Sequence, residues 1–346
     1  MNPFDGPRMR RPRHRTPVRR LAAIVVVALA ISGIAAVSLT FRRDLAEARA
    51  ATIGRSEVVD SPWGPIEYAD TGTGTPVLFI HGSGGGFDQA LAFSAPLGGQ
   101  GVRVIAPSRF GYLRSAMPDG ASVEMQADAL EWLMRRLGVE EAVIFGGSAG
   151  ALAATQLALR RPELCRGLVL AVPALYAPDR SPGANAAPDP TTQRAINAAL
   201  GSDLLFWAGI RAAPRFMTRM VLATDPATVR AASDSERKRV REVMFHILPV
   251  SARREGLLMD SATAGAPPAW PVEQITCPTL IIGARGDLYE TDKAAIYTAN
   301  RIPDARLVLY PDGGHLWVGH DAELWRTVAD FVAGLEPAPA PALAGP

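Results

Sequence analysis

The stretch Gly146-Gly147-Ser148-Ala149-Gly150 matches the pattern G-x-S-x-G and decides the fold. Before it lie the apolar, β-prone residues 142–145, and after it residues 151–160 contain no Gly or Pro. This context predicts a strand that turns abruptly into a helix at Ser148. Such a turn holds its central residue in a strained backbone conformation and lifts the serine hydroxyl clear of the sheet.

The start of the following helix would also present unpaired N–H groups to an oxyanion that forms beside Ser148. A glycine-rich β–α turn with a solvated serine can give the same five residues when the motif stands alone. The surrounding chain therefore has to distinguish a catalytic serine from an ordinary turn.

Strand patterns alternate with amphipathic helix patterns on both sides of the motif. The expected strands are residues 56–59, 66–69, 76–80, 102–106, 142–145, 167–172, 279–283 and 305–310. The expected helices are residues 122–137, the segment after Ser148, and residues 291–300 and 322–335. This order predicts an α/β fold with a mostly parallel sheet, flanked by helices, whose sites lie at the C-terminal ends of the strands.

The alternation stops near Ala174, and no strand pattern interrupts the next hundred or so residues. Residues 191–200, 202–212 and 234–248 have helix patterns instead. An all-helical insertion after the sixth strand predicts a lid over the C-terminal edge of the sheet. We therefore expect a core at 55–175 and 273–335, a helical cap at 176–272, and a disordered tail of alternating Ala and Pro at 336–346.

The N-terminus has a composition of its own. Residues 1–20 carry seven arginines and one acid, whereas residues 21–41 carry no charge and as a helix would span roughly the 30 Å of a bilayer core. We expect a basic cytoplasmic tail at 1–20, a transmembrane anchor at 21–41, a linker at 42–54, and the remaining chain outside the cytoplasm. A cleaved signal peptide and a secreted product are the alternative, but the apolar run exceeds the usual h-region of about 7–15 residues.

The charge balance and the metal-binding residue types exclude several classes of function. The first 20 residues contribute +6 to a net charge of +2, so the remaining chain is mildly acidic and offers no surface for nucleic acid. Two isolated cysteines, Cys165 and Cys277, adjoin predicted buried strands, which favours buried free thiols over a bridge. The five histidines lack metal-ligand spacing, and we expect no metal and no cofactor.

A catalytic serine needs a base to take its proton, and the base needs an orienting acid. His315 follows Gly313 and Gly314 in a loop that leaves the last predicted strand, from which it can reach over the sheet edge. Asp287 leaves the strand at 279–283 after one small turn. We prefer these two to His320, which precedes Asp321, the expected cap of the final helix, and to Glu290 and Asp292; Asp292 also resembles a helix cap.

The run His81-Gly82-Ser83-Gly84-Gly85-Gly86 follows another predicted strand. Its glycines allow the backbone to approach a ligand closely and to point N–H groups at an anion. We expect a second oxyanion donor here, in addition to the N–H of Ala149. A phosphate-binding loop is the alternative, but the lysine of a P-loop is missing.

With these stretches in place, residues 55–335 resemble the α/β-hydrolase superfamily, in the branch with a helical cap. The resemblance rests on His81-Gly82, on Ser108 to Tyr112 with Ser115, on the G-x-S-x-G motif, on Cys277-Pro278-Thr279 leading to Asp287, and on Gly314-His315. It implies that Ser148 is the nucleophile, His315 the base, Asp287 its orienting acid, and the N–H groups of Ser83 and Ala149 the oxyanion hole. Many relatives have Asp-x-Arg-Gly where this chain has Ser108-Arg109-Phe110-Gly111, a departure outside the triad.

These observations predict a membrane-anchored serine hydrolase that cleaves a carboxylic ester or related acyl compound through an acyl-enzyme. Phe87 and Trp317 are expected to bind the acyl group in an apolar pocket together with aromatic and Met side chains of the cap. An acyltransferase or a carbon–carbon bond hydrolase would use the same triad. A non-catalytic α/β-hydrolase-fold binding protein at the membrane is the alternative from another class.

Overall fold

The computed structural model describes residues 17–181 and 190–335. The expected disordered tail at 336–346 and most of the basic tail at 1–20 lie outside the described residues. The chain divides into two units, Met1–Ala46 and Glu47–Pro346. In the first unit the helix α1 (Pro17–Ala50) begins, and from Arg20 it is long and apolar enough to cross a membrane, by length and composition.

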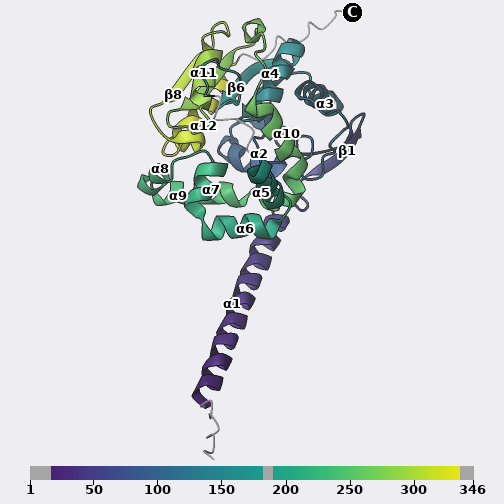
Figure 1. The fold of residues 1–346 in the computed structure, drawn as a ribbon. Helices are drawn as coiled ribbons and strands as arrows, with labels where there is room; N and C mark the ends of the chain where they lie inside the picture. Colours follow the sequence, from purple (N-terminus) through teal and green to yellow (C-terminus); the bar gives the residue numbers. More distant parts are fainter. Residues whose placement is uncertain (1–16, 182–189, 336–346) are drawn as a thin grey trace, which may run out of the picture. The chain divides into compact units, whose positions relative to one another are not determined.

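In the second unit one eight-stranded sheet has the order β1-β2-β4-β3-β5-β6-β7-β8 (Figure 1). Strand β2 is antiparallel to both of its neighbours, and all the other pairs are parallel. The strands are β1 (Glu57–Ser61), β2 (Gly64–Gly72), β3 (Thr75–Ile80), β4 (Val102–Pro107), β5 (Ala142–Gly147), β6 (Cys165–Ala171), β7 (Thr279–Ala284) and β8 (Arg306–Tyr310). The mostly parallel sheet expected from the sequence is therefore present.

Helices cover both faces of this sheet, which explains why its central strands are apolar throughout. Leu78 and Ile80 of β3 pack in a core cluster with α3 (Val123–Arg136), α4 (Gly150–Arg160) and α11 (Thr291–Ala299). Their strand neighbours Val77 and Phe79 point the other way and pack in a cluster with α2 (Phe87–Ser94) and α12 (Asp321–Gly334). Helix α2 was not expected from the sequence.

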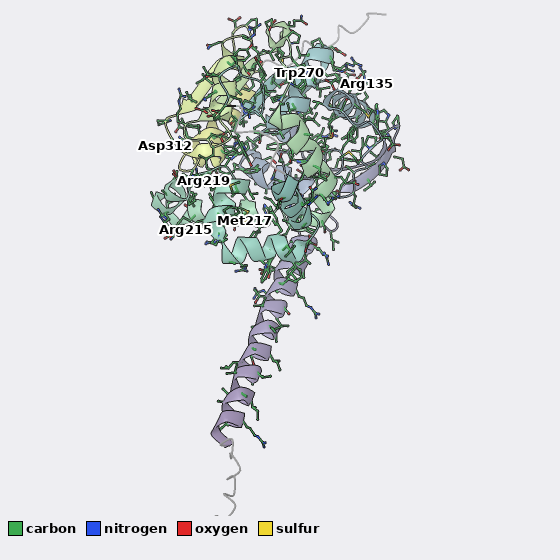
Figure 2. The ribbon with its side chains drawn as sticks, viewed as in Figure 1. Arg135, Arg215, Met217, Arg219, Trp270 and Asp312 are labelled. Carbon is green, nitrogen blue, oxygen red and sulfur yellow. The ribbon has the colours of Figure 1, made fainter. Side chains whose placement is uncertain are left out.

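Between β6 and β7 the described chain is helical, as expected. Its elements are α5 (Pro190–Leu200), α6 (Asp203–Ala212), α7 (Pro214–Val221), α8 (Pro226–Ala231), α9 (Asp234–Phe245), a 3-10 turn at Val250–Arg253, α10 (Arg254–Gly265) and a 3-10 turn at Val272–Gln274. Figure 2 labels Met217 on α7 between Arg215 and Arg219; Met217 is buried, whereas the two arginines are exposed. The action of these helices as a lid stays a prediction.

Two expected helix caps are wrong. Asp292 is the second residue of α11 rather than its cap, and its carboxylate pairs with Arg285 at 3.0 Å. Asp321 is the first residue of α12, where its Oδ1 accepts a hydrogen bond from Trp317 Nε1. In both cases a side chain that precedes the helix holds the carboxylate that local spacing assigned to the helix end.

Candidate active site

Ser148 lies at the sharp turn between β5 and α4. Its φ of 50° is in the left-handed region, which is uncommon for a residue with a side chain. The N–H of Ser148 donates to the Ala171 carbonyl at 2.9 Å, which fixes the turn to β6. A Cβ added at Gly150 would lie 2.3 Å from the Ile80 carbonyl oxygen, so only glycine allows α4 to begin this close to the end of β3.

The loops after β7 and β8 bring two further side chains to Ser148. His315 Nε2 lies 2.9 Å from Ser148 Oγ, and His315 Nδ1 lies 2.8 Å from Asp287 Oδ2. Gly313 and Gly314 both have positive φ, which lets the chain turn back over the sheet edge just before the histidine. The structure thus joins the three predicted residues in one hydrogen-bonded chain.

The partners of Asp287 define which nitrogen of His315 carries the proton. The Asp287 carboxylate also accepts hydrogen bonds from the Tyr289 N–H at 2.8 Å and from the Thr291 hydroxyl. A carboxylate that accepts from all its neighbours leaves Nδ1 of His315 as a donor, so Nε2 is free to accept from the Ser148 hydroxyl. Sequence reasoning missed Tyr289 and Thr291, although both follow Asp287 within four residues.

The rival residues have other partners. His320 bonds to Asp312 at 2.6 Å and stacks on the Tyr310 ring, with the two ring centroids 4.4 Å apart. The Glu290 carboxylate accepts hydrogen bonds from the backbone and the hydroxyl of Ser181. Neither side chain takes part in the hydrogen-bonded chain of Ser148.

Ser83 and Ala149 are the predicted oxyanion donors. The loop after β3 lies against the serine, since a Cβ added at Gly82 would be 3.2 Å from Ser148 Cβ. Among the contacts of the described residues, the N–H groups of Ser83 and Ala149 find no acceptor. Unpaired N–H groups next to a serine hydroxyl are what a developing oxyanion requires.

The residues 81–86, called the oxyanion loop below, are held from several sides. The N–H of Arg109 donates to His81 Nε2 at 2.9 Å, so the other nitrogen, Nδ1, donates to the Gly82 carbonyl. Burial, assisted by the Arg109 charge, holds the pKa of His81 well below its usual value, and this histidine is neutral. The fully buried Arg253 binds the Gly85 carbonyl and pairs with Asp88 at 2.7 Å.

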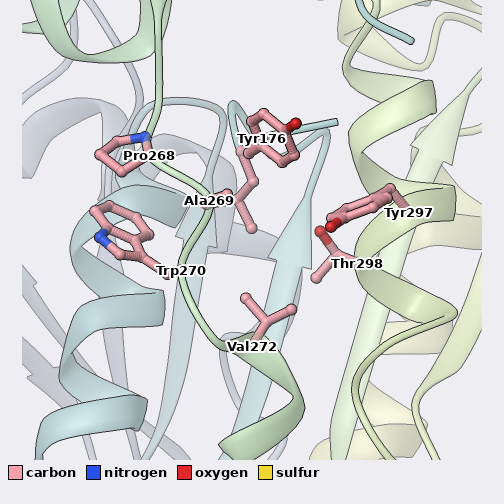
Figure 3. A pocket seen from close by; sticks show the side chains of 8 residues that line it. Tyr176, Pro268, Ala269, Trp270, Val272, Tyr297 and Thr298 are labelled. Carbon is pink, nitrogen blue, oxygen red and sulfur yellow. The ribbon is translucent and has the colours of Figure 1, made fainter. Parts of the chain in front are cut away.

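Phe87 and Trp317, the predicted acyl-binding residues, are both buried and belong to the core cluster on the α2 and α12 face of the sheet. Their contact with a substrate stays a prediction. Elsewhere an apolar hollow is lined by Leu175, Tyr176, Pro268, Ala269, Trp270, Val272, Tyr297 and Thr298 (Figure 3). None of the triad residues lines this hollow.

The structure also bears on the expected metal and thiol chemistry. Within residues 17–181 and 190–335, no group of three or more His, Cys, Asp or Glu side chains is arranged to hold a metal ion. Cys165 and Cys277 are buried free thiols, as predicted. Their Sγ atoms lie 2.8 Å apart, a proximity that the sequence did not indicate.

The sheet order, the strained serine turn and the loops that converge on it define a hydrolase of the α/β class. The chain belongs to the α/β-hydrolase family, whose model, described as alpha/beta hydrolase fold, matches residues 75–318. It is an α/β-hydrolase enzyme, since its relatives in sequence are hydrolases over most of their length.

Relatives in sequence are hydrolases, and a solved structure shares the fold. The chain is 27% identical over 258 residues to the "Putative carbamate hydrolase RutD" of Stutzerimonas stutzeri, covering 73% of this chain and 89% of that protein. It is 28% identical over 272 residues to the 2-hydroxymuconate semialdehyde hydrolase of a Pseudomonas species, covering 76% and 89%. A thermophilic esterase from Thermogutta terrifontis has the same fold, with a TM-score of 0.61, 23% identity, and coverage of 82% of this chain and all of that chain.

Proposed function

We propose that this hydrolase cleaves a carboxylic ester or a related acyl compound through an acyl-enzyme on Ser148. The observation that carries the proposal is the hydrogen-bonded chain from Ser148 through His315 to Asp287. A serine hydroxyl is a poor nucleophile near neutral pH, and a neutral imidazole nitrogen at 2.9 Å can accept its proton as it attacks.

The first half of the reaction acylates the serine. Ser148 Oγ attacks the carbonyl carbon while His315 Nε2 takes the proton, and the carbonyl oxygen becomes an oxyanion. We assign the N–H groups of Ser83 and Ala149, which find no acceptor among the described residues, as the donors to that oxyanion. When the tetrahedral intermediate collapses, His315 returns the proton to the leaving alcohol, and the acyl group stays on Ser148.

The second half repeats these steps with water. His315 takes a proton from the water as it attacks the acyl-enzyme, and the acid product leaves when Ser148 regains its proton. The Asp287 carboxylate stabilises the positive imidazolium that forms in each half. Its hydrogen bonds from Tyr289 and Thr291 hold the carboxylate in the orientation that His315 needs.

Activity-based labelling tests this proposal. A fluorophosphonate should label the parent protein and fail to label Ser148→Ala, and the variant should hydrolyse model esters several orders of magnitude more slowly while keeping the parent's melting temperature. A Ser148→Ala protein with the parent's rate would refute the nucleophile. Three substrates then separate the possible reactions: acyl esters report ester hydrolysis, a vinylogous diketone reports carbon–carbon cleavage, and an added alcohol reports acyl transfer. If the parent protein shows neither labelling nor turnover, a binding protein is favoured.

We further propose that residues 21–41 anchor the enzyme in a membrane with the catalytic unit on the extracytoplasmic side. The support is the helix from Arg20 to Ala50, which is long and apolar enough to cross a bilayer, and the arginines that precede it. Carbonate washing of membranes and N-terminal sequencing test it. A soluble product that begins near Ala51 would show a cleaved signal peptide.

A further inference from the structure

We propose that Asp260 is a positioning residue that fixes the oxyanion loop for catalysis. This inference rests on the proposed serine hydrolase function and adds a residue that acts through the loop rather than on the substrate. Asp260 lies on α10, in the helical segment between β6 and β7, far from the loop in sequence. Its carboxylate is 3% exposed.

The Asp260 carboxylate collects hydrogen bonds from three different residues around the oxyanion loop. Arg109 donates twice, from Nη1 at 2.7 Å and from Nη2 at 2.6 Å. The Tyr112 hydroxyl donates to Oδ2, and the Ser83 hydroxyl donates to the same oxygen at 2.9 Å. A carboxylate with this many donors is held in one orientation and holds its donors in turn.

Each donor is also tied to the backbone of the loop. Ser83 is the loop residue whose own N–H is the proposed oxyanion donor. The Tyr112 hydroxyl accepts a hydrogen bond from the Gly84 N–H at 3.2 Å, and Arg109 Nε donates to the His81 carbonyl at 2.9 Å. Asp260 therefore reaches three positions of the loop, at residues 81, 83 and 84.

The Asp260 carboxylate shifts the pKa values of two of its hydrogen-bond donors, Arg109 and Tyr112. Arg109 is buried, and although burial alone lowers the pKa of its guanidinium, the Asp260 carboxylate raises it above its usual value. Burial and the Asp260 charge raise the pKa of Tyr112, so that its hydroxyl stays a donor. Removing the carboxylate would leave a buried arginine without its counter-charge, and we expect the loop to relax around it.

The loop needs such support because its own sequence cannot supply it. Gly82, Gly84, Gly85 and Gly86 restrict the backbone little, and Gly84 has a positive φ. A flexible loop loses transition-state stabilisation, since a donor that shifts by about 1 Å can cost about 10²-fold in rate. Asp260 thus supplies from the helical segment the rigidity that the glycines lack.

The test uses the Asp260→Asn variant of the full chain. We expect kcat to fall about 10- to 100-fold, which is less than the 10²- to 10³-fold fall in kcat when an oxyanion donor is removed outright. KM should stay within about threefold of the parent's value. Affinity for an alkyl boronic acid, which forms a tetrahedral adduct on the serine, should fall by the same factor as kcat, while affinity for the product carboxylate should not change. A merely structural role would not separate these two ligands.

Two further variants keep the inference testable if Asp260→Asn does not fold. Ser83→Ala keeps the N–H and the Arg109 pair but removes one tether, and we expect a kcat about 3- to 10-fold lower at an unchanged melting temperature. Asp70→Asn is the matched control, because Asp70 also accepts two hydrogen bonds from one arginine, Arg103, at 2.9 and 2.6 Å. It joins β2 to β4 away from the loop and should leave kcat unchanged.

The outcomes separate the two proposals. The role of Asp260 alone would be overturned if Asp260→Asn and Ser83→Ala fold and keep the parent's kcat and boronic acid affinity while Ser148→Ala is inactive. A Ser148→Ala protein with full activity would overturn the serine mechanism and the role of Asp260 with it.

We also infer, from a separate observation, that Cys165 and Cys277 form a disulfide under oxidising conditions. They are the only cysteines of the chain, they are 112 residues apart, and the fold brings their Sγ atoms to 2.8 Å. Cys165 begins β6 and Cys277 precedes β7, so the bridge would join two neighbouring strands at the edge opposite Ser148. The segment it closes includes all the helices from α5 to α10.

The oxidation is a balanced exchange with an external disulfide, either a small molecule or a protein. The thiolate of one cysteine attacks one sulfur of the external disulfide and releases the other sulfur as a thiol. The thiolate of the second cysteine then attacks the Sγ of the first and releases the second thiol. Because both thiols are buried in the folded chain, this exchange takes place during folding.

Refolding the chain in a glutathione redox buffer tests the bridge. We expect no free thiol in the denatured product, an intact mass lower by two hydrogens, and a melting temperature about 3–8 °C above that of the Cys165→Ser variant or the reduced protein. The kcat should not depend on oxidation. Two free thiols, or a mixed disulfide with glutathione, would overturn the inference.

Discussion

The Gly150→Ala substitution tests whether the close approach of α4 to β3 builds the site. A Cβ at position 150 would lie 2.3 Å from the Ile80 carbonyl oxygen and 2.5 Å from the His81 carbonyl oxygen. Contacts of a Cβ atom below about 3.4 Å are tighter than nine in ten real ones, so the two segments must separate by about 1 Å. Both obstacles are backbone atoms, which cannot rotate away as a side chain can.

The separation should cost both stability and rate. Overpacking a core costs about 1–3 kcal/mol, and we expect the upper end of that range because the contact is with backbone. His81 begins the oxyanion loop, so its movement shifts the Ser83 N–H relative to Ser148. A displacement of a catalytic group by about 1 Å can lower the rate about 10²-fold, and we expect kcat to fall by that factor or more.

Urea denaturation and ester hydrolysis measure the two effects. Gly147→Ala is the matched control within the same motif, since the nearest atom to its added Cβ is a Phe145 ring carbon at 3.6 Å, an ordinary contact. It should change the free energy of unfolding by no more than about 0.5 kcal/mol. A Gly150→Ala enzyme with the parent's midpoint and kcat would refute the reasoning, as would a Gly147→Ala enzyme that is equally impaired.

Three further predictions address the site. His315→Ala should lower kcat by about 10⁵–10⁶-fold because Ser148 loses its base, whereas His320→Ala should stay near normal; steady-state kinetics with a model ester would contradict the assignment if the order were reversed. Asp287→Asn should lower kcat about 10³–10⁴-fold by removing the acceptor that orients His315, whereas Glu290→Gln should change kcat little. A severe loss of kcat in Glu290→Gln, measured in the same assay, would count against the choice of Asp287. The pKa of His81 is held well below its usual value, so below about pH 6.5 the unfolded chain binds a proton at His81 that the folded chain does not, and the stability that neutral His81 contributes above this pH is lost as the pH falls. His81→Gln should therefore flatten the decline in unfolding free energy between about pH 7 and 5. A slope equal to the parent's would refute this.

Much of the fold and the candidate site could be predicted from local sequence. Strands such as β3 and β5 are buried on both faces, so they show as short apolar runs between turn residues, and α3 shows as an amphipathic pattern that starts at the Ser122 cap. The turn at Ser148 and the loop at His315 could be placed because their glycines follow strands directly. Parallel strands end at one edge, so residues just after them meet there whatever the length of chain between them.

The tertiary structure alone decided which polar side chains meet across the insertion and which carboxylates are already engaged. Glu290 and Asp287 are three residues apart, and the sequence could only prefer one; in the fold Glu290 accepts hydrogen bonds from Ser181 while Asp287 faces His315. Likewise nothing near Asp260 in sequence points to Arg109, because their pairing depends on how α10 packs against the loop after β4. Sequence patterns determine local periodicity and the ends of elements, whereas contacts between side chains far apart in the chain depend on packing, which has no local period to reveal it.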